Sequence, residues 1–302
     1  DLNEAWHTRF IDWESVAPER VPRGKTCLPQ DVDWRYFMEH IQIAGILQSR
    51  SAVIRNADPL QRPVFAHKGG PSIGSSVDWT YARCQDFLGT SCYPAWSPTR
   101  EWDDAHAADG KEFDRVESLR AAIWAGVSLV FDYIRSCNPD GNPIWAAEFQ
   151  GGPVSTGMHW GRTPSAFDIR RWMLTAVGCG VTAISLWVAR SELMAFETNG
   201  FSLLDSVGDE TDRLAEAGKI GRALAAYPEL FGESNLPRPR VAIGVNGWNW
   251  ALCNEMEGAA EHLEYSTRGW QRLFWEAGVP VDFFALHGRE EMDMAQYRFL
   301  LL

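Results

Sequence analysis

Apolar positions along the chain follow two different spacings. Between Glu112 and Arg135 they recur three or four residues apart, which is the strongest helical pattern in the sequence. Short apolar runs bounded by Pro, Gly or Asn are typical of strands that are covered on both faces of a parallel sheet. The pattern predicts helices over residues 32–55, 78–85, 112–135, 165–177 and 211–226, and strands over 63–67, 86–92, 144–148 and 181–187.

Helix and strand alternate four times across these segments, which predicts parallel βα units and an α/β fold. A (β/α)8 TIM barrel needs eight strands. The first unit of the chain is therefore either an open sheet or the second half of a barrel whose first half is missing.

A segment with three prolines, 228–239, predicts a linker after this first unit. Beyond it, the pattern predicts strands over 241–245, 281–284 and 297–302 and a helix over about 257–277, as at the start of another α/β domain. The predicted organisation is a barrel domain at 1–232, a linker at 233–239 and the start of a second domain at 240–302.

The charge balance narrows the class of ligand. The sequence has 28 Lys and Arg against 40 Asp and Glu, a net charge of −12, and it contains no basic run. Neither nucleic acid nor a membrane surface is expected as a partner. Six scattered cysteines are expected to be reduced and mostly buried, a cytoplasmic location is favoured, and no cofactor is expected. Fifteen Trp residues would suit sugar rings, although most Trp in proteins is core.

Two short motifs match known signatures in their letters alone. Residues 178–183 spell G-x-G-x-x-A, but they lie between a predicted helix and the next strand, which reverses the dinucleotide-binding order. Residues 70–74 spell G-x-S-x-G, but a loop separates Ser72 from its strand, which a nucleophile elbow does not allow. Neither a P-loop nor an H-E-x-x-H zinc motif occurs. With these motifs excluded, catalysis by carboxylate side chains is the leading hypothesis.

Glu148 is the leading candidate for that chemistry, because it places a charge at the end of an otherwise apolar strand. Catalytic groups gather at the carboxyl ends of parallel strands, although a Glu there can also belong to a structural network with an Arg. Tyr93 and Trp96 follow another predicted strand and share this edge. His67 precedes a glycine-rich loop and is either a wall residue of the site or a structural histidine.

A glycosidase needs a second carboxyl group across the scissile bond. Glu192, Glu197 and Asp205 follow the next strand and are candidates, although acids in a loop are more often simply solvated. Trp160 lies beyond Glu148 on the same connection, either as a platform for a sugar ring or as an aromatic packed on the barrel rim.

Several of these residues fall in one ordered series. The series contains Leu2-Asn3-Glu4-Ala5-Trp6 with Phe10, Asp86 with Tyr93-Pro94, Glu148-Phe149-Gln150, and Leu186-Trp187 with Glu197. It resembles the glycoside hydrolase family 42 β-galactosidases over most of the chain. The resemblance implies a (β/α)8 barrel, a flavodoxin- or glutaminase-like trimerisation domain and a small β domain. It also implies that the protein is a retaining enzyme of carbohydrate metabolism, that its substrates are small-molecule glycosides, and that the full-length form is a homotrimer.

The resemblance also implies roles for individual residues. Glu148, at the end of the seventh barrel strand, matches the nucleophile. The positions that match substrate-binding residues are Tyr93, Trp160, Trp187 and Glu197, the last as the acid that holds the galactosyl hydroxyls. The family's acid/base is the Glu of an Asn-Glu pair after the fourth strand. It is expected upstream of Asp1, so residues 1–302 are expected to be a fragment that is inactive alone.

Three positions depart from the family pattern: His7 stands where a Gly is usual, Ser91 where an Asp is usual, and Gly200, beside Asn199, where a His is usual. These departures bear on the sugar more than on the reaction. The sequence therefore predicts a retaining β-glycosidase, with terminal β-galactosides as substrates. The alternatives are a barrel glycosidase for a different sugar and a sugar-binding protein that has lost catalysis.

Overall fold

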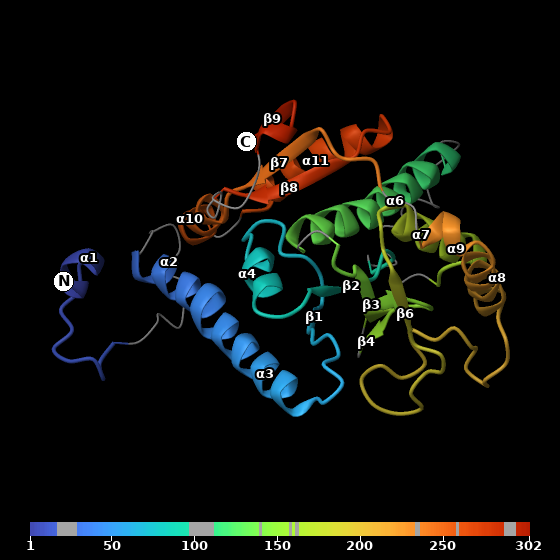
Figure 1. Ribbon diagram of the computed structural model, residues 1–302, viewed down its shortest axis with the longest axis horizontal. Coiled ribbons are helices and arrows are strands. Elements are labelled where there is room, and N and C mark those ends of the chain that lie inside the picture. The colour runs from blue at the N-terminus through green and yellow to red at the C-terminus, as the bar shows by residue number, and fades with distance from the viewer. Residues whose placement is uncertain are drawn as a thin grey trace.

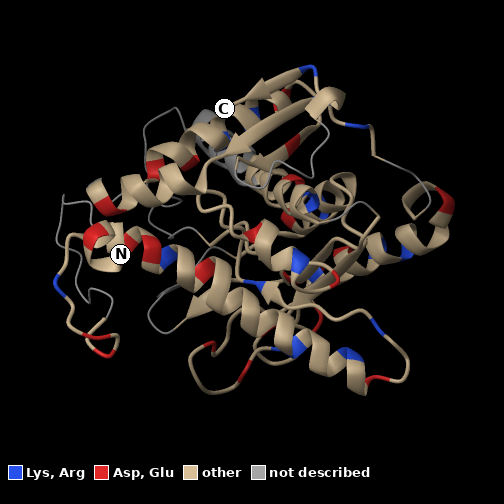
Figure 2. Cartoon of the chain, turned by 60° about the vertical axis from the view of Figure 1, so that its left-hand side comes forward, with Lys and Arg blue, Asp and Glu red and all other residues tan. Residues whose placement is uncertain are grey.

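A computed structural model gives the fold (Figure 1). It describes residues 1–16, 29–96, 112–138, 141–156, 159–160, 163–232, 236–257, 260–286 and 294–302. None of the described helices is long and apolar enough to cross a membrane. Figure 2 shows the described Lys and Arg residues spread over several elements and not gathered on one of them, as the lack of a basic run predicts.

The first sheet has four parallel strands in the order β1-β2-β3-β6. The strands are β1 (His67–Lys68), β2 (Gly89–Cys92), β3 (Trp145–Gln150) and β6 (Ala183–Trp187), and the helices that connect or follow them are α4 (Asp78–Arg83), α6 (Glu112–Cys137), α7 (Ala166–Gly178) and α8 (Asp212–Ala226). The spatial order follows the chain order without reversal. That is the wall of a (β/α) barrel, because a doubly wound sheet reverses its strand order part-way.

The remaining elements of this part of the chain lie before, after and between those units. They are α1 (Leu2–Trp6), α2 (Pro29–Tyr36), the π-helix η1 (Phe37–Ile43), α3 (Ala44–Ala57), the antiparallel pair β4 (Ser155–Thr156) and β5 (His159–Trp160), and α9 (Pro228–Phe231). The helix predicted over 32–55 therefore starts earlier, at Pro29, and its middle is a π-helix that the hydrophobic spacing did not predict.

Strand β1 is shorter than the predicted strand at 63–67. The amide of Val64 donates to Asp86 Oδ2 at 2.6 Å, and the amide of Ala66 donates to Gln85 Oε1 at 2.6 Å. Side chains therefore satisfy the backbone groups that a neighbouring strand would otherwise satisfy. Only His67 and Lys68 pair with β2.

The second sheet has three parallel strands in the order β8-β7-β9. Its elements are β7 (Val241–Val245), α10 (Gly247–Glu257), α11 (Glu261–Glu276), β8 (Val281–Ala285), the 3-10 helix η3 (Met294–Gln296) and β9 (Phe299–Leu301). With its first strand between the second and the third, this sheet has the order with which flavodoxin-like folds begin. The prediction of one helix over 257–277 missed α10. The domain boundaries at 232 and 240 stay a prediction.

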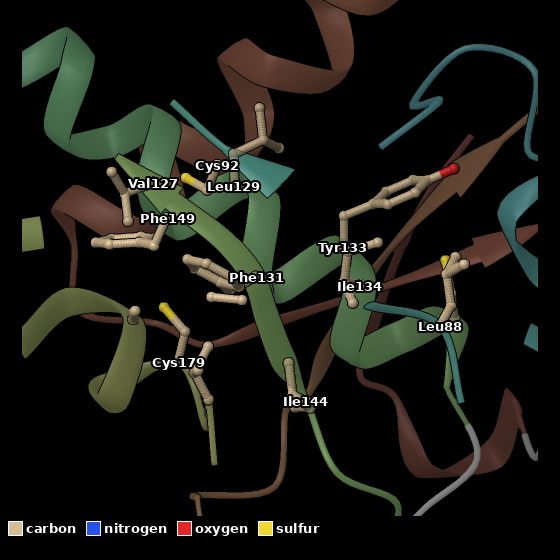
Figure 3. Close-up of a cluster of buried hydrophobic side chains, with 14 of the residues drawn as sticks. Leu88, Cys92, Val127, Leu129, Phe131, Tyr133, Ile134, Ile144, Phe149 and Cys179 are labelled. Atoms are coloured by element: carbon tan, nitrogen blue, oxygen red, sulfur yellow. The ribbon is translucent and has the colours of Figure 1, made fainter. Parts of the chain in front are cut away.

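Helix α6 packs against both sheets (Figure 1). Phe131 lies beside Phe149 of β3, with ring centroids 6.1 Å apart, and Figure 3 shows this pair within the cluster of buried side chains. Tyr133 lies beside Phe283 of β8, with ring centroids 5.4 Å apart. All four side chains are almost fully buried, so one hydrophobic core extends from the barrel wall to the second sheet.

A buried polar contact joins α6 to α11. Gln271 is 1% exposed and donates to Ser128 Oγ and to Asp132 Oδ2, each at 3.0 Å. Burial raises the pKa of Asp132, and both the charge of Arg135 and the bond from Gln271 oppose that rise. Arg135 also donates to the carbonyl of Val281 at 2.7 Å. Hydrogen bonds between buried polar groups therefore join the two units, in addition to the hydrophobic contacts.

Replacing Gln271 with Leu removes a buried donor from Asp132 and Ser128 and should lower the free energy of unfolding by about 1–3 kcal/mol. The adjacent Arg272 makes an exposed ion pair with Glu276, so Arg272→Ala should change that free energy by less than about 0.5 kcal/mol. Urea unfolding of the intact protein, followed by Trp fluorescence, measures both variants. Equal losses would contradict the role given to the buried contact.

Candidate active site

An irregularity in β3 decides where the Glu148 side chain points. Thr90 of β2 pairs with Ala146, yet Ser91 pairs with Glu148, so β3 has one residue more than β2 between these pairs. The register with β6 shifts in the same stretch, between Ala146 and Phe149. Ala146 and Phe149 are both 0% exposed and belong to the core beneath α6.

In a regular strand, residues two apart share a face. Glu148 would then share the core face with Ala146, where its charge would be buried beneath α6. The extra residue turns Glu148 to the opposite face, and re-aiming a side chain is what β-bulges commonly do beside active sites. Glu148 is also not at the strand tip as predicted. It lies two residues before the end of β3.

Three side chains surround the Glu148 carboxylate. Ser91 Oγ and Tyr93 Oη each donate to Glu148 Oε2 at 3.0 Å, and His67 Nε2 lies 3.3 Å from Oε1. The Glu148 side chain remains 26% exposed. Among the described residues no Arg or Lys forms an ion pair with Glu148, and His67 is its ion-pair partner there. The site presents an accessible carboxylate that accepts hydrogen bonds from two hydroxyl groups and lies beside an imidazole.

Tyr93 belongs to an aromatic wall. Its ring meets Trp96 edge-on at 5.6 Å and Phe201 edge-on at 5.4 Å between centroids. Burial is the main cause that raises the pKa of Tyr93 above its ordinary value. The negative charges of Glu148 and, to a smaller extent, Glu197 add to this rise. The phenol therefore keeps its proton across the physiological range and remains a donor to Glu148.

Phe201 is a residue that the sequence reasoning missed. It follows Gly200 in a loop that reads as polar, yet it is 2% exposed and its φ is 62°, in the left-handed region that bulky residues rarely adopt. Two backbone bonds hold it there, from the Phe201 amide to Pro153 O at 2.6 Å and from the Val188 amide to Phe201 O at 2.9 Å. No local pattern in the sequence indicates such a position.

The three candidate acids of the loop after β6 separate in the structure. Glu197 Oε2 accepts a hydrogen bond from Trp187 Nε1 at 3.3 Å, and Trp187, the last residue of β6, pairs with Gln150 of β3, two residues after Glu148. Asp205 Oδ1 instead accepts the amides of Val207, Gly208 and Asp209 and forms a local turn. Glu192 is exposed. Glu197 is thus the acid that the fold brings to the site.

Gln150 and Trp160 follow Glu148 in the sequence. Gln150 is 0% exposed, accepts the Ala95 amide at 2.8 Å and donates to Gly152 O at 2.9 Å, so it ties the turn after β2 to β3. Trp160 lies in β5, but its side chain is outside the part of the chain that the structure describes.

Within the described residues, no three His, Cys, Asp or Glu side chains form a group that could hold a metal ion.

Comparison with known proteins identifies the family. The model of the family 42 glycoside hydrolases, described as β-galactosidase, matches residues 1–227. The chain belongs to glycoside hydrolase family 42. The resemblance drawn from the sequence is therefore confirmed. No curated protein sequence matches the chain.

Solved structures of family 42 enzymes share the fold. The β-galactosidase Gan42B of G. stearothermophilus is 20% identical, with a TM-score of 0.74, and the match covers 99% of this chain and 42% of that one. The β-galactosidase of Bacillus circulans sp. alkalophilus is 15% identical, with a TM-score of 0.76 over 99% and 41%. That of Marinomonas ef1 is 16% identical, with a TM-score of 0.73 over 99% and 45%.

These matches confirm the predicted α/β fold with part of a TIM barrel. The chain spans less than half the length of the β-galactosidases whose structures it matches. At this identity the likeness of the structures establishes the fold alone.

Tyr93→Phe removes one of the two donors to Glu148 Oε2 while keeping the ring that packs on Trp96 and Phe201. In the full-length family 42 protein, kcat for an aryl glycoside should fall about 10- to 100-fold, because a hydrogen bond to a charged group is lost. Steady-state kinetics measure this. Tyr265→Phe, at an exposed position of α11, is the matched control and should leave kcat unchanged. A Tyr93→Phe enzyme as fast as the wild type would contradict a catalytic role for the hydrogen bond from Tyr93 to Glu148.

Proposed function

We propose that this chain contributes the nucleophile of a retaining β-galactosidase and that the nucleophile is Glu148. One observation carries the proposal: an accessible carboxylate, turned out of the core by a bulge, whose neighbours are Ser91, Tyr93 and His67. Family membership supports glycoside hydrolysis as the reaction.

In this mechanism an oxygen of Glu148 attacks the anomeric carbon of the glycoside. The new bond joins the sugar to the enzyme, the bond to the leaving oxygen breaks, and a second carboxylic acid gives that oxygen its proton. The same group then removes a proton from the water that hydrolyses the glycosyl-enzyme. The hydroxyl donors on Oε2 hold the carboxylate and supply no proton to the reaction.

The second carboxyl group must lie about 5–5.5 Å from Glu148 in a retaining enzyme. We assign it to the Asn-Glu pair that the family resemblance places after the fourth barrel strand, outside residues 1–302. The solved relatives, more than twice as long as this chain, support that assignment. On this proposal the 302 residues alone do not turn over substrate.

Around the nucleophile, Glu197 is proposed to accept hydrogen bonds from sugar hydroxyls, with its carboxylate oriented by Trp187. Tyr93 and Trp96 would line the sugar site, and Trp160 is proposed as a stacking platform. For the full-length enzyme we propose a homotrimer that uses the second α/β domain, as the family resemblance implies.

A different sugar is the second candidate, and Gly200 favours it. A Cβ placed on Gly200 would lie 2.4 Å from Ser155 Cβ, so this loop has no room for the His that is usual in the family at this position. Asn199 is exposed beside it. A contact that a His would make to the sugar must therefore be absent or replaced.

Glu148→Gly and Glu148→Gln test the function in the full-length protein. Both should lower kcat for an aryl β-galactoside by about 10³-fold or more, because the attacking oxygen is lost. Azide should restore turnover to the Gly variant and yield the glycosyl azide of inverted configuration. Glu229→Gln, at an exposed position of α9, is the control. A panel of aryl glycosides compares galactose with other sugars. Turnover of the Gln variant at the wild-type rate would refute the proposal.

A further inference from the structure

Of the three described side chains that surround the Glu148 carboxylate, His67 is the one to which the proposed reaction assigns no role. It lies in β1 and pairs with Gly89 of β2, so its backbone belongs to the same sheet as Glu148. The inference below rests on the proposed function, because it concerns how the nucleophile is held.

Lys68 anchors β1 on the side of the sheet away from the site. Its Nζ lies 3.0 Å from Asp78 Oδ1 and also contacts Ser72 Oγ. The Asp78 side chain is completely buried and accepts the Ser72 amide at 2.5 Å as well. Because consecutive side chains of a strand point to opposite faces, this ion pair directs His67 to the face on which Glu148 lies.

Gly89 provides the space for the His67 side chain. A Cβ on Gly89 would lie 2.8 Å from Phe65 Cε2 and 3.2 Å from His67 Cβ, so a larger residue there would displace both side chains. His67 is therefore held by its strand partner, by the neighbouring ion pair and by packing. A site constructed in this way keeps the imidazole at a fixed distance from the carboxylate.

The two oxygens of Glu148 have different partners. Ser91 and Tyr93 both donate to Oε2, whereas His67 Nε2 faces Oε1 at 3.3 Å. This 3.3 Å contact is within ion-pair range, and because a carboxylate accepts only, a hydrogen bond between the two groups would require that Nε2 carry the proton. Two donors on one oxygen leave the carboxylate free to rock about them, and a donor on the other oxygen fixes its plane.

We propose that His67 is a positioning residue for the nucleophile: its Nε2–H holds Oε1 so that the carboxylate presents a lone pair to the anomeric carbon. The His67 side chain is partly exposed, at 37%, and its Nε2 faces Oε1 of Glu148. We expect its replacement to affect turnover more than folding.

The test compares His67→Leu with His67→Gln in the full-length protein, using 4-nitrophenyl β-D-galactoside as substrate. The Gln amide nitrogen reaches the position of Nε2 and keeps the donor, whereas Leu removes it. For the Leu variant, kcat should fall about 10- to 100-fold with KM changed less than about threefold, and the Gln variant should stay within about threefold of the wild type. His262→Leu, at an exposed position of α11, controls for loss of a histidine and should have no effect.

A Leu variant with wild-type kcat, or a Gln variant as slow as the Leu variant, would overturn the proposal. If the Leu variant does not fold, His67→Asn takes its place, because the Asn amide ends at the position of Nδ1 and cannot reach Oε1. The Asn variant should be slow, and a kcat equal to that of the wild type would overturn the proposal. Absence of turnover in the wild-type enzyme would refute the proposed function itself, which separates the two failures.

Discussion

The bulge in β3 imposes the constraint on which the rest of the site depends. Ala146 and Phe149 must both face the core beneath α6, and they are three residues apart, so the strand needs one extra residue between them. That residue is what turns Glu148 away from the core. The hydroxyls of Ser91 and Tyr93 can reach the carboxylate only because of this turn. Removing the extra residue would return the charge to an apolar environment, where it would be costly.

Helix α6 keeps the bulge in place, because its buried side chains press on Phe149 from one face and its other face packs on the second sheet. On the site's side, the loops after β3 and β6 pack so closely that a Cβ on Gly152 would lie 2.2 Å from Ser202 O. The rim is therefore assembled from loops that have little freedom to move separately. Such rigidity suits a reaction that requires a carboxylate at a defined distance from the anomeric carbon.

Much of the fold follows from hydrophobic spacing. The helices α6 and α7 were both predicted, because their signals are local, and a capping box at Ser165 begins α7. The choice of Glu148 and Tyr93 also followed from strand ends, and a hydrogen bond joins the two side chains in the structure, whereas the family resemblance singled out Glu197 among three acids of its loop. The bulge and the left-handed Phe201 were not predicted, since both arise from pairing and packing between distant segments. Ser91 was noted only as a departure, yet its hydroxyl donates to Glu148.

The central claim is that Glu148 is the residue that bonds to the sugar. A 2-deoxy-2-fluoro-β-D-galactoside with a good leaving group should trap that bond, because the fluorine slows hydrolysis of the intermediate more than its formation. Mass spectrometry of peptides from the treated full-length enzyme then locates the adduct. One fluorogalactosyl group is expected, on Glu148 in the peptide that contains Phe149 and Gln150. A label on Glu197, or no label on an enzyme that hydrolyses galactosides, would contradict it.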